Sequence, residues 1–228
     1  MENFFTMDDF EVNSTWKVHI IPFQKILILY IHDIYKNPYR VYEYLKQAPI
    51  KTHKDVTKDS VNGKDFADGQ HLVDNRWDVS RLHLYNKIRE FYGVEVKDGQ
   101  VGHGAANTDD HLVPFSRYNQ FRLNSDHPGE DKFFHPHQDN IINCCTYLNP
   151  DVGDHAGTVL YSTLSSDPCD ELEHEKPWKT MDDGFRPELS IMSKFNCMAV
   201  FPGQIFHGQN IIGNHFKEQT RFTEVVFF

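Results

Sequence analysis

Apolar residues recur in two distinct patterns along the first part of the chain. Residues 17–34 hold two β-branched apolar stretches separated by Pro22, and this pattern predicts two strands. Asn37-Pro38 then resembles a helix cap followed by proline at the first helical position. Apolar residues continue from there at helical spacing, at Tyr39, Val41, Tyr42 and Leu45. A helix is therefore predicted over 38–47.

The next periodic segment predicts a second helix, over 79–92. Asp78 stands where a capping residue is expected, and apolar residues that would share one face follow it, at Leu82, Tyr85, Ile88 and Tyr92. The segments on either side of this helix, 50–77 and 94–112, are polar and rich in turn formers. Both are predicted to be loops.

From about residue 114 onward, short apolar stretches alternate with turn signals. They predict strands over 115–122, 133–138, 141–148, 157–163, 189–193, 196–201, 204–212 and 220–228. An acidic, turn-rich segment over 165–188 interrupts this series, and we expect it to be an irregular surface insertion. Many short strands after an early helical section indicate an antiparallel sandwich or barrel with helices packed outside it.

The composition narrows the class of protein. A chain of 228 residues with 39% hydrophobic and 14% aromatic content suits a single domain with one substantial core. The formal net charge is −10, and no stretch is dense in lysine and arginine. Neither nucleic acid nor an acidic membrane surface is therefore expected as a partner.

Cysteine usage and the chain start favour a reduced, cytoplasmic setting. The four cysteines show no CxxC metal spacing, and two of them are adjacent, which disfavours pairing: Cys144, Cys145, Cys169 and Cys197. The first residues lack the basic start and cleavage site of a signal peptide. The longest apolar run, Ile26–Ile31, is too short to span a membrane.

The segment Phe133–Asp139 holds the strongest chemical signal. On a strand, residues two apart project to the same face, so His137 and Asp139 would reach one metal ion together. Two histidines and one carboxylate bind Fe(II) on one face and leave other positions open. The bare HxD pattern is weak evidence, because it also occurs at His53-Lys54-Asp55, in a polar loop that suits a solvated surface pair.

A third ligand is available further along the chain. His207 follows a strand and a Pro-Gly turn, 70 residues after His137, as expected for ligands on different strands of one barrel. A hydrogen-bonded core histidine is the alternative interpretation of His207. His135 also lies two residues from His137, and a set of three histidines and a carboxylate would resemble a cupin site. We favour Asp139 as the ligand and His135 as a neighbouring group.

The last predicted strand supplies a cation. Arg221 and Thr223 would share one face, so a guanidinium fork and a hydroxyl would enter one cavity, an arrangement suited to a carboxylate. A surface ion pair with Glu224 is the simpler alternative for an isolated arginine.

Residues 113–228 resemble the Fe(II)/2-oxoglutarate dioxygenase superfamily and, within it, the prolyl 4-hydroxylase-like branch. Four blocks carry the resemblance in the family's order: His137-Gln138-Asp139, the pair of segments Cys145–Pro150 and Ala156–Tyr161, Phe201-Pro202-Gly203 through His207, and Thr220-Arg221-Phe222-Thr223. Two departures stand out. Lys217 lies nearer the usual spacing of the family's basic residue than Arg221 does, and Ala156-Gly157 replaces a common pair of glycines.

The resemblance implies an α+β fold with a double-stranded β-helix (jelly-roll) core. One domain would span 1–228, with 1–112 as supporting helices and strands and 113–228 as the core that carries the insertion. The resemblance assigns Fe(II) to His137, Asp139 and His207, and assigns 2-oxoglutarate to Arg221 and Thr223. Two tyrosines are further candidates to contact this cosubstrate, Tyr147 and Tyr118.

The implied activity is O2-dependent hydroxylation of an unactivated C–H bond in a small molecule or a prolyl-like peptide. Segments 50–77 and 165–188 are the expected substrate walls, with Trp77, Trp178 and Arg186 as possible contacts. The alternative function is a cupin-type metal-binding or sensory protein without 2-oxoglutarate turnover. The sequence predicts no oligomeric state.

Overall fold

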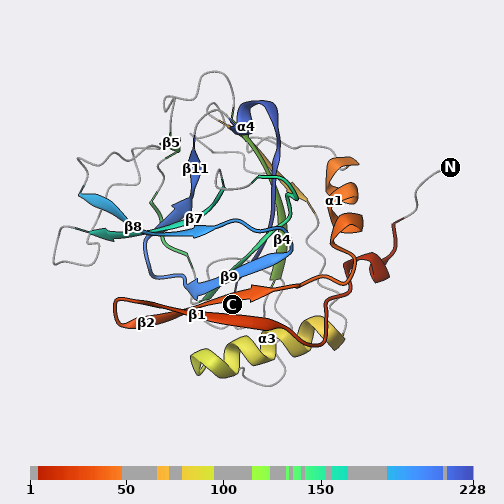
Figure 1. The fold of residues 1–228 in the computed structure, drawn as a ribbon, viewed down its shortest axis with the longest axis horizontal. Helices are drawn as coiled ribbons and strands as arrows, with labels where there is room; N and C mark the ends of the chain where they lie inside the picture. The colour runs from red at the N-terminus through yellow and green to blue at the C-terminus, as the bar shows by residue number, and fades with distance from the viewer. Residues whose placement is uncertain are drawn as a thin grey trace.

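The computed structural model describes residues 5–47, 66–71, 79–94, 115–123, 132–133, 136–139, 142–152, 156–163, 184–212 and 215–227. They form a sheet-rich α+β fold with few helices, as predicted (Figure 1). In chain order the elements are η1 (Met7–Phe10), β1 (Lys17–Phe23), β2 (Ile26–His32), α1 (Pro38–Gln47), β3 (Phe66–His71), α3 (Val79–Tyr92), β4 (Phe115–Leu123), β5 (Lys132–Phe133), β6 (Ile142–Tyr147), β7 (Gly157–Thr163), β8 (Phe185–Met192), β9 (Cys197–Pro202), β10 (His207–Gln209), β11 (Ile211–Ile212), α4 (His215–Glu218) and β12 (Arg221–Phe227).

In the described part of the chain, the strands form three antiparallel sheets. The large sheet has the order β1-β2-β9-β6-β12-β4-β3, and the smaller ones have the orders β10-β7-β8 and β11-β5. Strands β1 to β3 come from the first half of the chain but lie in the same sheet as β4, β6, β9 and β12. Central strands β6 and β12 pair directly, with Thr223 opposite Tyr147.

Side chains alternate between the two faces of the large sheet, and each face buries its own apolar cluster. We call the face towards the helices the helix face, since Cys144, Leu148 and Val226 pack there with residues of α1 and α3. We call the opposite face the site face, where Tyr147 and Phe201 pack with Leu160 of β7 and with β8. The large sheet is therefore sandwiched between helices and the β10-β7-β8 sheet.

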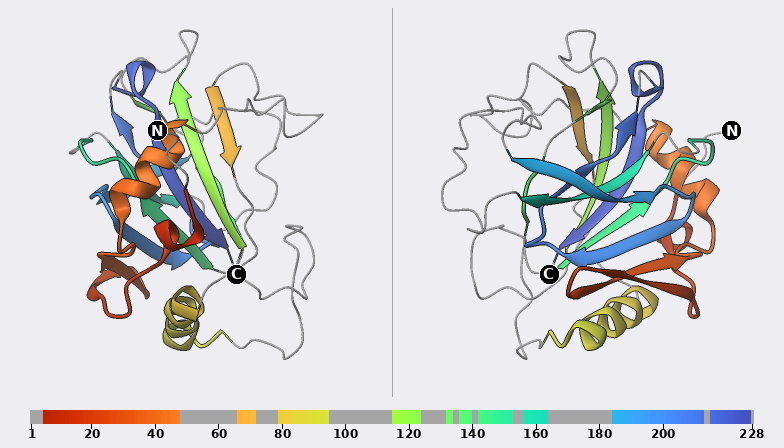
Figure 2. Two further views of the ribbon diagram at one scale, coloured as in Figure 1. Left: turned by 90° about the vertical axis from the view of Figure 1, so that its right-hand side faces the viewer. Right: turned by 60° about the vertical axis from the view of Figure 1, so that its left-hand side comes forward.

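The two helices lie where the sequence predicts them. Helix α1 buries Val41 and Leu45, and α3 buries Leu84, Tyr85 and Ile88 against the large sheet. The predicted inward position of Leu82 is wrong, because Leu82 is 45% exposed and the buried face of α3 is turned towards Leu84 instead. The views of Figure 2 show α3 along the β1–β2 hairpin. Among the described residues, no helix is long and apolar enough to cross a membrane.

Several predicted boundaries need correction. Pro22 does not separate the first two strands but lies within β1, at the sheet edge, where a missing N–H donor is tolerated. The chain turns instead at Gln24, which has a φ of 52°. The segment predicted as a loop over 50–77 contains β3, which hydrogen-bonds along β4. The described residues do not include the rest of this segment, Asp78, or residues 95–112 of the predicted loop over 94–112.

The C-terminal strands also differ in detail. The predicted insertion over 165–188 ends earlier than expected, because β8 begins at Phe185 and pairs with β7. Within the predicted strand over 133–138, the described residues contain the end of β5 at Phe133 and a single bridge at His137. The predicted strand over 204–212 is divided into β10 and β11, which join different sheets.

Candidate metal centre

A single backbone bridge brings two distant histidines together. His137 and His207 exchange two backbone hydrogen bonds of 2.9 Å each, and the Asp139 N–H donates to the carbonyl of Gly203 at 2.9 Å. His207 is the first residue of β10, as predicted, but His137 and Asp139 do not lie on a continuous strand. Pairing with the segment 203–207, rather than the pleat of one strand, therefore places these two side chains.

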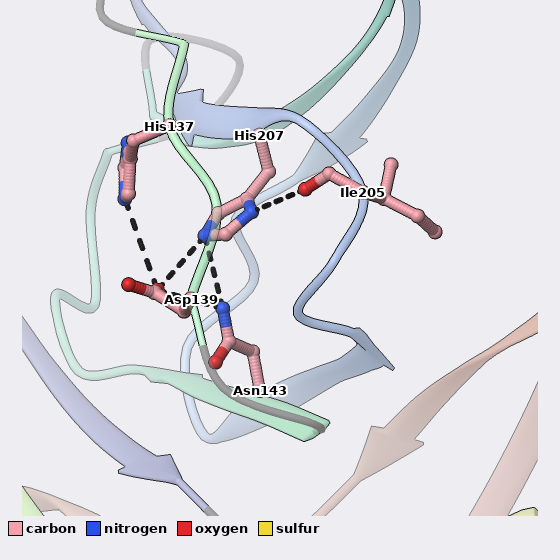
Figure 3. A network of polar contacts seen from close by, with 5 residues as sticks. All are labelled: His137, Asp139, Asn143, Ile205 and His207. Atoms are coloured by element: carbon pink, nitrogen blue, oxygen red, sulfur yellow. Dashed lines mark hydrogen bonds and ion pairs between the residues drawn. The ribbon is translucent and has the colours of Figure 1, made fainter. Parts of the chain in front are cut away.

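The side chains of His137, Asp139 and His207 converge, as Figure 3 shows. The Asp139 Oδ2 lies 3.0 Å from His207 Nε2 and 3.8 Å from His137 Nε2, and the three ligand atoms are within 4.8 Å of one another. His207 is buried, whereas the side chains of His137 and Asp139 are 38% and 27% exposed. The cluster is closed on the side of His207 and accessible to solvent on the other side.

The Ile205 carbonyl determines how His207 presents its ring. The His207 Nδ1 lies 2.7 Å from this oxygen, so the neutral imidazole keeps its hydrogen on Nδ1 and donates it to the carbonyl. Nε2 then carries the lone pair of the ring and accepts a hydrogen bond from the Asn143 amide at 2.9 Å (Figure 3). This is the orientation that a metal-binding histidine requires.

Asp139 is held in its ionised form. Burial by itself would raise the pKa of Asp139, but in the acid range where Asp139 titrates, the hydrogen bond from the charged His207 ring, the positive charges of His137 and His207, and the Asn143 amide lower it to about 2. Asp139 is consequently a carboxylate at any physiological pH.

These donors fit a divalent transition metal. Two imidazole nitrogens and one carboxylate oxygen, with solvent on the open side, form the set that suits Fe(II). The His207 lone pair already faces the cluster, and Asp139 supplies a negative charge. Within the described residues, no other group of three such side chains is close enough to hold a metal ion.

Asn143 belongs to this cluster and was missed by the sequence reasoning. Its Nδ2 lies 2.8 Å from Asp139 Oδ2 and 2.9 Å from His207 Nε2, and its side chain is fully buried on β6. The available signal was one polar residue within the apolar run Ile141–Cys145. The sequence reasoning interpreted this run only as a strand.

Arg221 is buried on the site face rather than exposed. Its Nη2 donates to the Gly157 carbonyl at 3.2 Å and its Nη1 donates weakly to Thr223 Oγ1 at 3.4 Å. The alternative of a surface ion pair with Glu224 is wrong, because Glu224 lies on the helix face and pairs with Arg81 at 3.0 Å. The predicted fork and hydroxyl therefore do share one face.

Tyr147 lies beside this pair. It stands opposite Thr223 across β6 and β12, and its hydroxyl is 2.8 Å from Thr158 Oγ1. Both side chains are buried. Arg221, Thr223 and Tyr147 thus form one polar group at the β12 start, with Thr158 of β7 as its fourth member.

Cys145 connects this group to the metal centre. It projects from β6 between Asn143 and Tyr147 and is only half-buried. Burial raises the pKa of its thiol to about 12, with Arg221 opposing the rise and Asp139 adding to it. Asn143, Cys145 and Tyr147 alternate with Cys144 and Thr146 along β6, so all three project to the site face.

Two residues fix the strand that carries Arg221. The Asn149 side chain donates to the Thr220 carbonyl at 2.8 Å and accepts from the Phe222 N–H at 2.6 Å, so it holds both neighbours of Arg221. Gly157 has a φ of 145°, and a Cβ there would lie 2.0 Å from the Ile191 carbonyl oxygen. Glycine is thus required where the backbone carbonyl meets Arg221.

The remaining predicted site residues are only partly described. Tyr118 pairs through its backbone with Glu224, and Lys217 belongs to the short helix α4, but their side chains lie outside the described residues. The described residues do not include six further residues named from the sequence: His53, Asp55, Trp77, His135, Cys169 and Trp178. Arg186 is exposed on β8.

Comparisons with known proteins complete the description. No family model matches the sequence, and no curated protein matches it. Among solved structures, a prolyl 4-hydroxylase from Pseudomonas putida is 12% identical, with a TM-score of 0.44 over 94% of this chain and 90% of that one. A prolyl hydroxylase from Trichoplax adhaerens, in complex with a peptide fragment of the hypoxia inducible factor oxygen degradation domain, is 12% identical, with a TM-score of 0.42 over 82% and 74%. The Fe(II)/α-ketoglutarate-dependent dioxygenase TqaL is 8% identical, with a TM-score of 0.37 over 84% and 74%. The chain is similar in structure to these proteins at low identity and low TM-score.

Proposed function

We propose that this chain is a non-haem Fe(II)- and 2-oxoglutarate-dependent oxygenase that hydroxylates an unactivated C–H bond. The observation that carries the proposal is the convergence of His137, Asp139 and His207, with their open side exposed to solvent. We further propose that residues 1–228 form one domain with a jelly-roll core, of which the large sheet and the β10-β7-β8 sheet are the two layers.

The residues of the cluster would each have a role in binding the metal. His137, Asp139 and His207 would hold Fe(II), with the His207 tautomer fixed by Ile205 and Asp139 ionised. When bound, the iron would supply the oxidative chemistry, in which O2 and 2-oxoglutarate are consumed, succinate and carbon dioxide are released and the substrate is hydroxylated.

Arg221 would bind the distal carboxylate of 2-oxoglutarate. Its guanidinium is buried and already bonded to uncharged oxygens of Gly157 and Thr223, so it is oriented before the cosubstrate arrives. Thr223 and Tyr147 would add hydroxyl contacts to the same carboxylate. The substrate class that we propose is a small molecule or a prolyl-like peptide.

The test is an anaerobic titration of the protein with Fe(II) and then with 2-oxoglutarate. We expect a weak visible charge-transfer band that appears only when both are present. His207→Ala should abolish the band, because it removes the buried ligand. His83→Ala is the matched control, since His83 is an exposed histidine on α3 and should leave the band unchanged.

The proposed binding of 2-oxoglutarate by Arg221 is tested in the same titration. Arg221→Ala should raise the 2-oxoglutarate concentration that gives half of the maximal band intensity by about 10–100-fold, which is the loss of affinity expected for a charge-assisted contact. Lys217→Ala should not change it. Wild-type protein that binds metal but never forms the band, and releases no succinate with any amino acid, peptide or metabolite, would support a cupin-type metal protein instead.

A further inference from the structure

Asn143 lies where a polar side chain needs a specific reason. It is on central strand β6, opposite Phe201 of β9 and Phe227 of β12, and its side chain is 0% exposed. A buried amide is unfavourable unless hydrogen bonds replace those it made to water. The Asn143 Oδ1 has no hydrogen-bond partner among the described residues, so the Nδ2 contacts alone account for this amide.

Both Nδ2 contacts are with proposed metal ligands. The two N–H hydrogens of an amide diverge, so one can point to Asp139 Oδ2 at 2.8 Å and the other to His207 Nε2 at 2.9 Å. Each of these atoms offers a lone pair, because a carboxylate oxygen accepts hydrogen bonds and the His207 ring donates its Nδ1 hydrogen to Ile205. The nitrogen of the amide therefore faces the cluster, since an oxygen there would meet two lone pairs.

The position of Asn143 separates it from the ligands. In Figure 3, Asn143 lies beyond the Asp139–His207 pair, on the side away from His137. Its amide contacts Asp139 Oδ2, the same oxygen that faces the Nε2 atoms of both histidines, and its backbone is fixed by two neighbouring strands. A donor in this place restricts the rotation of Asp139, which itself lies on an irregular segment outside the strands.

A second buried asparagine shows what a purely structural amide looks like in this molecule. Asn196 accepts from the Tyr35 N–H at 2.7 Å and donates to the Tyr35 carbonyl at 3.0 Å. Both of its amide atoms are bonded, and both bonds are to the backbone. Asn143 instead bonds with one atom only, and only to side chains of the cluster.

From this contrast we propose that Asn143 is a positioning residue of the metal centre, which orients the Asp139 carboxylate through its amide N–H. When a metal ion takes the single lone pair of His207 Nε2, the hydrogen bond from Asn143 to Asp139 would remain. The inference rests on the proposed metal site. Groups that orient metal ligands in this way typically change metal affinity by 10–100-fold when they are removed. The same loss is expected here on removal of the Asn143 amide.

The experiment measures Mn(II) binding to the full chain without 2-oxoglutarate, from the loss of the free Mn(II) electron paramagnetic resonance signal. Asn143→Leu keeps the side-chain volume and removes the donor, and Asn143→Ser keeps a small polar group that is too short to reach both ligands. Both variants should bind Mn(II) about 10–100-fold more weakly than wild type. The visible bands of bound Co(II) should also shift in both variants.

Asn196→Gly is the matched control. It removes a buried amide that is away from the cluster, and glycine tolerates the φ of 62° at this position. This variant should melt at a lower temperature but should bind Mn(II) as wild type does. Equal Mn(II) affinity in wild type and in whichever Asn143 variant folds would overturn the inference, as would an equal loss in Asn196→Gly. Wild type that binds no Mn(II) would overturn the proposed metal site itself.

Discussion

The two faces of the β6–β12 pair each carry a carboxylate, and the two carboxylates have very different surroundings. On the helix face, Glu224 is 1% exposed and contacts Arg81 at 3.0 Å, the Tyr35 hydroxyl and Thr146 Oγ1 at 3.4 Å. On the site face, Asp139 is 27% exposed and faces two histidines and the Asn143 amide. The first carboxylate is enclosed by protein, and the second is still open on one side.

The difference between the two faces lies mainly in the kind of cation. A guanidinium is always charged, so Arg81 gives Glu224 a permanent positive partner. Asp139 instead faces two imidazole rings, and an imidazole, unlike a guanidinium, has a ring nitrogen that can bind a metal ion. Such a cluster is suited to a metal cation, whereas the enclosed pair on the helix face is suited to fixing α3 against β12.

The largest predicted effect follows from removal of the Arg81–Glu224 ion pair on the helix face. Glu224→Ala would leave the buried Arg81 guanidinium without its carboxylate, and the free energy of unfolding should fall by about 3–5 kcal/mol. Urea denaturation measures this loss. Lys87→Ala, which removes an ion pair with both side chains more than half exposed, should not change the midpoint. If both variants unfold at the same urea concentration, the helix-face pair is not a structural element.

The next effect concerns the site face and depends on pH. The pKa of Asp139 is lowered from 3.8 to about 2 in the folded protein, so its stabilising contribution is complete above about pH 4 and is lost as the pH falls towards 2. In metal-free protein at pH 4–5, the free energy of unfolding of wild type should exceed that of Asp139→Asn by at most about 2 kcal/mol, because one unit of pKa corresponds to about 1.4 kcal/mol. Denaturation curves between pH 2 and 5 measure the difference. A constant difference throughout this window would contradict the assigned shift.

The sequence predicted what depends on local pattern and residue type. Strand alternation, the helix start at Pro38 and the three candidate metal-binding side chains were all recognisable, because a strand or helix has its own period and histidines and carboxylates are the side chains that suit Fe(II). Arg221 and Thr223 share the site face because residues two apart on a strand always do.

Features that depend on which strands become neighbours could not be predicted. Asn143 meets His207 only because the His137 bridge brings the start of β10 close to β6, and Arg81 meets Glu224 only because α3 packs on the helix face of the large sheet. The phase of α3 was misjudged for a similar reason, since a buried arginine at position 81 shifts the inward face away from Leu82. Pairing across the sheet, rather than the local sequence, decided each of these contacts.

The smallest predicted effect is that of Tyr147→Phe, which we compare with Tyr35→Phe. Both tyrosines are buried, one on each face of the sheet. The Tyr147 hydroxyl bonds an uncharged partner, Thr158, so Tyr147→Phe should lower the free energy of unfolding by only about 1 kcal/mol. The Tyr35 hydroxyl donates to Glu224 and accepts from Arg81 at 2.6 Å, so Tyr35→Phe should lower it by about 1.5–3 kcal/mol.

The order should reverse when cosubstrate use is measured. Tyr147→Phe removes a hydroxyl opposite Thr223 and should raise the KM for 2-oxoglutarate, whereas Tyr35→Phe acts behind the sheet and should leave this KM near that of wild type. Steady-state succinate release at several 2-oxoglutarate concentrations, paired with urea denaturation of the same two variants, measures both quantities. If the two variants changed KM equally, Tyr147 would be a packing residue of the core like Tyr35. A rise in KM for Tyr147→Phe alone would assign cosubstrate binding to the site face and leave the helix face with a structural role.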